Sequence, residues 1–99
     1  MTEPEALVHL MGAYFHQDWD LDHSDEWEVL LAFERDEPEL SRQLPDEIAQ
    51  VLARFQAEPE LEQYLVRGLG ADYNARYNGG TYRAWLQQIS DRVRATLER

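Results

Sequence analysis

Apolar side chains recur along the first part of this chain at the three- and four-residue spacing of a single helix face. The first of these stripes predicts a helix from Leu7 to Phe15. A second helix begins after Asp25, which stands three residues before Glu28, the spacing of a capping pair, and Pro38 ends it. The positions expected to be buried are Leu7, Val8, Leu10, Met11, Tyr14 and Phe15 in the first helix and Trp27, Leu30, Leu31 and Phe33 in the second.

Three more helices are predicted further along, over about 45–55, 59–68 and 82–97. A proline stands in the first turn of the first two, where its missing N–H costs nothing, and glycines follow the second. After a loop, Thr81 can cap the last helix. The positions expected to be buried are Ile48, Val51, Leu52, Phe55, Leu61, Tyr64, Leu65, Tyr82, Trp85, Leu86, Ile89, Val93 and Leu97.

No segment of useful length alternates between apolar and polar residues as a half-buried strand would. Ninety-nine residues suffice for one hydrophobic core and are too few for two. The sequence therefore predicts an all-α fold, a compact single-domain bundle of about five helices over residues 1–99.

The compartment is indicated by what the chain does not contain. It has no cysteine, which excludes a disulfide framework and fits a reducing environment. The acidic N-terminus is unlike a secretory signal, and no apolar run approaches the roughly 20 residues that cross a bilayer. We therefore expect a soluble protein of the cytoplasm that does not bind membranes.

Negative charge is concentrated in the first two thirds of the chain. Residues 1–62 hold 17 Asp and Glu against three Arg, whereas residues 63–99 hold three acids against six Arg. Such a field repels nucleic acid and anionic membranes and attracts basic proteins, so direct nucleic-acid binding is not expected. The alternative is that the charge only keeps the protein soluble.

Metal and cofactor sites are not expected. The Asp18-x-Asp20-x-Asp22 run has the alternating carboxylates that open a calcium loop. The sixth and twelfth positions, however, are His23 and Val29 in place of the required glycine and glutamate. His16 and His23 have no recognised zinc-ligand spacing.

No catalytic residues are predicted, because no serine lies in a Gly-x-Ser-x-Gly turn and the Asn78-Gly79-Gly80-Thr81 turn is explained by a helix cap. A small hydrolase that uses His16 with Asp18 or Asp20 is one alternative. An acidic interaction adaptor, or a regulator that mimics DNA, is another.

Two sequence blocks carry a resemblance to a known family. They are Tyr14-Phe15-His16-Gln17-Asp18-Trp19-Asp20 and, near the end, Gly79-Gly80-Thr81-Tyr82-Arg83-x-Trp85-Leu86, with an acidic helix between them. Over nearly its whole length the chain resembles the small helical CdiI-type immunity proteins of bacterial contact-dependent growth inhibition. The resemblance implies that the protein binds the C-terminal toxin domain of a secreted or cell-surface effector, often a nuclease, and neutralises it in the cytosol.

The acidic first part then suggests how such a toxin is held. A nuclease must attract a polyanion, so its active-site face is usually basic. The carboxylates expected to pair with toxin Lys and Arg are Asp20, Asp22, Asp25, Glu26, Asp36, Glu37 and Glu39. A structural role is expected for Tyr14, Phe15, His16, Asp18, Trp19 and Trp85, whereas Tyr73 and Tyr77 could belong to the core or to the rim of the contact. The partner is expected to be a basic toxin domain, and the chain itself a monomer or weak homodimer.

Overall fold

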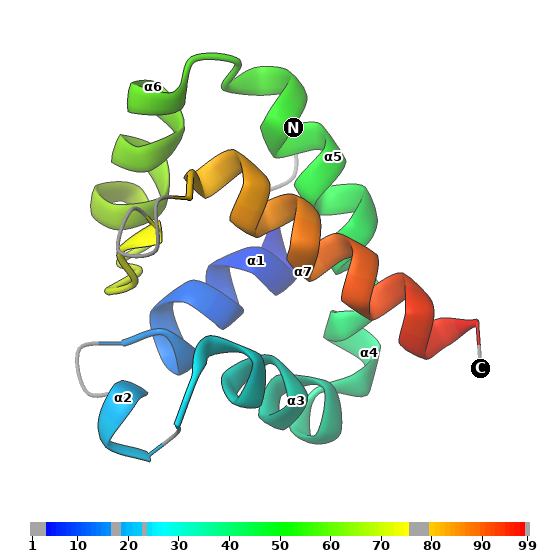
Figure 1. Cartoon of the computed structure of the whole chain (residues 1–99). Coiled ribbons are helices and arrows are strands. Elements are labelled where there is room, and N and C mark those ends of the chain that lie inside the picture. Colours follow the sequence, from blue (N-terminus) through cyan, green and yellow to red (C-terminus); the bar gives the residue numbers. More distant parts are fainter. Residues whose placement is uncertain (1–3, 17–18, 23, 76–79, 99) are drawn as a thin grey trace.

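The computed structural model describes residues 4–16, 19–22, 24–75 and 80–98, and all regular secondary structure in these ranges is helical (Figure 1). The helices are α1 (Glu5–His9), which continues into the π-helical turn η1 (Leu10–Tyr14); α2 (Trp19–Asp22); α3 (Glu26–Asp36); α4 (Pro38–Ser41); α5 (Leu44–Arg54); α6 (Glu58–Gln63), which continues into the π-helical turn η2 (Tyr64–Gly68); and α7 (Tyr82–Leu97). In the described part of the chain this makes five long helical segments and two single turns. The predicted all-α fold of about five helices is confirmed.

Helix α7 crosses the molecule and packs mainly against α5, with α6 beside its first half (Figure 1). Helix α1 packs on α5, η1 on α3, and α4 lies against both α1 and α3. The largest fully buried side chains are Phe15, Phe33, Leu7, Leu10, Met11, Leu44, Ile48, Leu61, Leu65, Leu86, Ile89 and Val29. None of the described helices is long and apolar enough to cross a membrane.

The predicted helix ends are formed by the expected side chains. The Asp25 carboxylate accepts a 2.8 Å hydrogen bond from the Glu28 N–H at the start of α3, and the Thr81 hydroxyl accepts one of 3.0 Å from Ala84 in α7. Each bond satisfies an N–H group that has no partner inside its helix. Gly70, at a φ of +79°, takes the left-handed conformation that lets the chain turn after η2.

The turn η1 lies close to the chain that follows η2. An ideal Cβ on Gly12 in η1 would lie 3.5 Å from the carbonyl oxygen of Leu69, which follows η2, so the two backbones approach closely here. Nearby, the Asp72 N–H donates a 2.8 Å hydrogen bond to the Phe15 carbonyl. The end of η1 is thereby fixed against the loop that follows η2.

Most positions predicted to be buried are buried, and two, Leu31 and Leu97, are exposed. Six others are half-buried: Val8, Tyr14, Trp27, Leu52, Phe55 and Tyr64. Leu31 is 65% exposed and Leu97 is 47% exposed. Helix α3 turns Val29 and Phe33 towards η1 and the core, and Leu31 lies two residues from each, on the opposite side of the helix. Alternative faces of a short helix can carry similar apolar stripes, and the sequence prediction chose one residue of the wrong face.

Two glutamates supply caps to helices other than their own. Glu47 on α5 accepts hydrogen bonds from the N–H groups of Ala6 and Leu7, at 3.2 and 2.9 Å, where α1 has no cap of its own. Glu58 on α6 accepts from Tyr82 and Arg83 of α7 at 2.7 and 3.2 Å. A carboxylate is favoured at these positions because a helix N-terminus carries partial positive charge.

Glu58→Ala is expected to lower the free energy of unfolding by about 1–3 kcal/mol, because two N–H groups of α7 would lose their acceptor in a half-buried place. Urea unfolding measures this loss. The matched control is Glu60→Ala, an exposed position on the same helix, which is expected to change stability by less than about 0.5 kcal/mol. Equal losses in the two variants would contradict the capping role.

Candidate functional site

One group of the predicted contact residues lies at the start of α3. Asp20 is exposed on α2, and Asp22 belongs to the same turn, although its side chain lies outside what the structure describes. Asp25 is the cap of α3, and the half-buried Glu26 carboxylate lies beside the Tyr73 hydroxyl and influences its pKa. Within this group, Asp25 and Glu26 have roles inside the fold, and Asp20 faces solvent.

An aromatic cluster supports this first group. The Tyr73 ring is stacked on Trp85, with 4.2 Å between centroids, and Phe15 meets Trp85 edge-on at 5.0 Å. Trp19 of α2 packs edge-on against Phe15 at 5.7 Å, and its indole N–H donates a 2.9 Å hydrogen bond to the carbonyl of Asp72. The short helix α2 is thus fixed by its tryptophan to the core, and Asp20 is presented next to that anchor.

The surroundings of Tyr73 favour the neutral form of its phenol. Burial, followed by the nearby Glu26 carboxylate, raises the pKa of the Tyr73 phenol to about 12. The neutral hydroxyl can donate to Glu26, whereas a phenolate would repel it. Tyr73, which the sequence left between core and rim, is therefore a half-buried residue held by a ring stack and a carboxylate.

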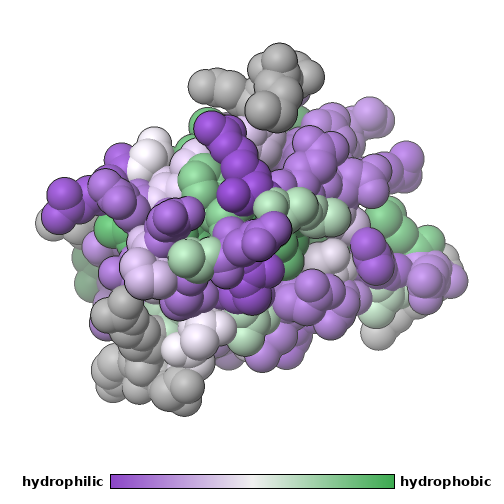
Figure 2. Space-filling view, turned by 90° about the horizontal axis from the view of Figure 1, so that it is seen from above, coloured by the Kyte–Doolittle hydropathy of each residue, from purple (hydrophilic) through white to green (hydrophobic). Residues whose placement is uncertain are grey.

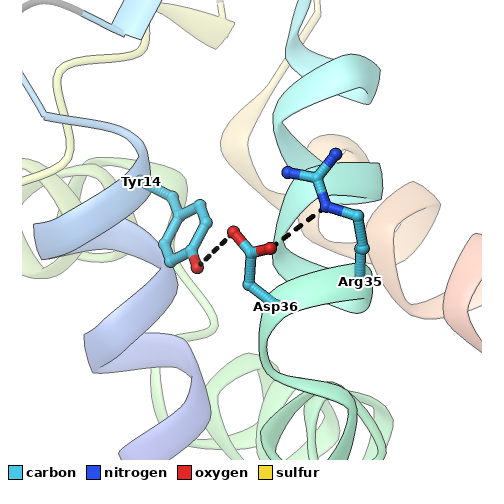
Figure 3. A network of polar contacts seen from close by, with 3 residues as sticks. All are labelled: Tyr14, Arg35 and Asp36. Carbon is cyan, nitrogen blue, oxygen red and sulfur yellow. Dashed lines mark hydrogen bonds and ion pairs between the residues drawn. The ribbon is translucent and has the colours of Figure 1, made fainter.

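A second group of predicted contact residues lies at the other end of α3 (Figure 3). The Tyr14 hydroxyl of η1 donates a 3.2 Å hydrogen bond to one oxygen of Asp36, and the Arg35 guanidinium is 3.1 Å from the other. The hydrogen bond from Arg35 lowers the pKa of the Asp36 carboxyl. Asp36 is therefore ionised over the ordinary pH range and holds η1 to α3 from the surface.

The remaining members of this second group flank Asp36. Glu37 lies 3.8 Å from the imidazole of His9, and Glu39 is exposed on α4. An 11-residue helix such as α3 is about 16 Å long. The two groups of predicted contact residues therefore lie at opposite ends of this helix and do not form one cluster. We call them the N-terminal and C-terminal acidic groups of α3.

The predicted structural motif is spread over the core and its edge. Phe15 and Trp85 are buried, Tyr14, His16 and Trp19 are half-buried, and Asp18 lies outside the described residues, as do Gln17, His23 and Tyr77. No group of three or more Asp, Glu or His side chains among the described residues could hold a metal ion. In this part of the chain the arrangement is one of charge and packing.

Glu34 is a further carboxylate on α3 that the sequence reasoning did not single out. It is half-buried, and burial raises the pKa of its carboxyl. Its position, seven residues after Trp27 and three after Leu31, continues one helical stripe. This spacing is the signal in the sequence that marks Glu34 as a neighbour of Trp27 and Leu31.

These features define a small helical protein with carboxylates exposed at both ends of α3. The sequence profile of the CdiI immunity proteins matches residues 3–93, and the chain belongs to that family. It is therefore a toxin-neutralising immunity protein and not an enzyme.

The fold also has a close counterpart among solved structures. A chain in the crystal structure of the CdiA-CT/CdiI complex from Y. kristensenii 33638 superposes with a TM-score of 0.84 at 26% sequence identity. The match covers 93% of this chain and 99% of that chain. No curated protein matches the sequence. The family assignment thus stands on both the sequence profile and the superposition.

The fold is expected to lose stability between about pH 10 and 12. The Tyr73 phenol ionises near pH 10 in the unfolded chain and near 12 in the folded one, so the unfolded state releases its proton first as the pH rises. We expect Tyr73→Phe to remove about 1–2 kcal/mol of this decline, a value reduced for the partial exposure of the ring. Urea unfolding at pH 8 and pH 11.5 measures it, and an equal decline in both proteins would contradict the assignment.

Proposed function

We propose that this immunity protein neutralises a toxin domain that is a nuclease, in the bacterial cytoplasm, by binding it one to one and blocking its active site or the surface beside it. The observation that carries the proposal is the excess of carboxylates in the first 62 residues, 17 against three arginines. A surface that binds a polyanion is basic, so an acidic inhibitor is complementary to it.

The contacts within the fold indicate which carboxylates remain for a partner. Glu47 and Glu58 are occupied by helix N-termini and Asp25 by its own helix. Asp20 and Glu39 are exposed at opposite ends of α3 and serve no such purpose in the described structure. We propose that these two pair with toxin Lys and Arg around α3, together with Asp22. Glu26, Asp36 and Glu37 are included because a carboxylate can accept further hydrogen bonds beside its contact within the fold.

Large apolar side chains are exposed only singly in the described part of the chain, which suits a polar contact. Figure 2 views the molecule from above Figure 1, the side away from α3, and that face too is mostly hydrophilic. The exposed large apolar side chains among the described residues are Leu21, Leu31, Val66 and Leu97, which come from four different helical segments. Rapid attraction through charge, followed by local packing, suits such a surface.

The nuclease part of the proposal is tested with the purified cognate toxin domain and labelled RNA and DNA. We expect the domain to cleave one of the two, and cleavage to fall in proportion to added immunity protein and cease at one equivalent. A toxin that cleaves neither nucleic acid, but is still bound, would contradict the nuclease assignment alone.

The association rate with the toxin domain is expected to fall at least about tenfold between 0.01 and 1 M salt, because the Debye length shrinks from about 30 to about 3 Å. Stopped-flow tryptophan fluorescence measures the rate. Asp20→Lys should slow association more than the matched change Glu60→Lys, which alters the charge equally on α6. A rate that is insensitive to salt would overturn attraction through charge.

A further inference from the structure

A groove of about 200 Å³ lies between α3 and α7, which run one below the other in Figure 1. Its walls include Trp27, Leu31 and Glu34 from α3 and Arg92 and Thr96 from α7. The groove lies along α3 between its N-terminal and C-terminal acidic groups. It opens on the side of α3 that faces α7, whereas Asp36 of the C-terminal acidic group contacts Tyr14 of η1 on another side of the helix.

One end of the groove is already filled by a cation. The Arg92 guanidinium lies over the Trp27 ring, 3.9 Å from its centroid, a favourable cation–π geometry. A second positive charge at this end would be repelled. A cationic side chain entering from outside is thus directed towards the other end, where Glu34 lies.

The Glu34 end has a negative charge that the fold compensates poorly. The Thr96 hydroxyl is within hydrogen-bonding reach of Glu34, but it also lies 3.1 Å from the carbonyl of Arg92, and its single proton can serve only one acceptor. No ion pair within the described residues involves Glu34. A half-buried carboxylate in this state gains from a cation brought by a partner.

Between the two ends lies Leu31, which is 65% exposed. An apolar centre with a charged border is the common anatomy of protein interfaces, and the centre contributes most of the binding energy. The methylene groups of Arg or Lys can cover such a leucine while the charged end reaches a carboxylate.

We propose that this groove receives an arginine or lysine side chain of the toxin domain, with its methylene groups against Leu31 and its charge at Glu34. The inference rests on the proposed function, because it takes the partner to be a basic toxin, and it identifies one contact of that complex.

The effect of a Glu34 variant on stability distinguishes a binding role for this residue from a structural one. Because burial holds the pKa of the Glu34 carboxyl above its unfolded value, its ionised form opposes folding at neutral pH. Glu34→Gln should therefore leave the melting temperature unchanged or raise it. If Glu34 had a purely structural role, its replacement would lower the stability of the protein.

The experiment measures the affinity of the purified cognate toxin domain for four variants by titration calorimetry at fixed salt. Leu31→Ala and Glu34→Gln are expected to weaken binding at least about tenfold. The matched controls are Val66→Ala, another exposed apolar residue, and Glu60→Gln, which changes the net charge equally on α6. Both controls should stay within about twofold of the wild type, and all four variants should retain the helical circular dichroism of the wild type.

The outcomes distinguish the two proposals. Wild-type affinity in Leu31→Ala and Glu34→Gln, or equal losses in Glu34→Gln and Glu60→Gln, would overturn the groove while the proposed function stands. A wild-type protein that does not bind the basic toxin domain would overturn the proposed function and the groove with it.

Discussion

The position of α7 depends on one exchange of hydrogen bonds at its first turn. The Glu58 carboxylate of α6 accepts from the N–H groups of Tyr82 and Arg83, and the Arg83 guanidinium donates to the carbonyls of Leu52 and Phe55 at the end of α5, at 3.0 and 2.6 Å. Free N–H groups at one helix end and free carbonyls at another are thereby satisfied together. Three helices are joined at one point, and the long apolar face of α7 is held over the core.

The acidic surface depends on this joint through the aromatic side chains of the core. Trp85, one turn into α7, holds Phe15 edge-on and Tyr73 in a stack. Those two rings contact Trp19 of α2, and Tyr73 also reaches Glu26. The carboxylates at the start of α3 are therefore presented by side chains that are already ordered before a partner arrives. A surface ordered in advance loses less conformational entropy on binding.

Contacts close in sequence could be predicted, and contacts distant in sequence could not. Asp25 and Thr81 cap the helices that immediately follow them, so their role was predicted from spacing alone. Glu47 caps a helix 40 residues away, and Glu58 one that is 24 residues away. Their partners are defined only once the helices have packed, and in the sequence they are indistinguishable from the surface carboxylates around them.

The same limit explains the outcome at the candidate site. The sequence predicted one acidic surface from residues near each other in number, but α3 separates them into groups at its two ends. Leu31 was assigned to the core because helical spacing identifies a stripe without telling which of two neighbouring stripes is buried. The groove, which needs residues from both α3 and α7, has no counterpart in any local pattern.

The carboxylates of this chain differ in what they do for the fold, and that difference supports a role in binding. Glu47 and Glu58 are needed by helix N-termini, whereas the exposed Asp20 and Glu39 contribute to the net charge of −11 without such a role in the described structure. Repulsion among such like charges opposes the compact state, and Glu34 opposes it further through its burial. If the toxin domain is basic, as we propose, its arrival would offset both costs, and these charges would then serve binding rather than the described fold.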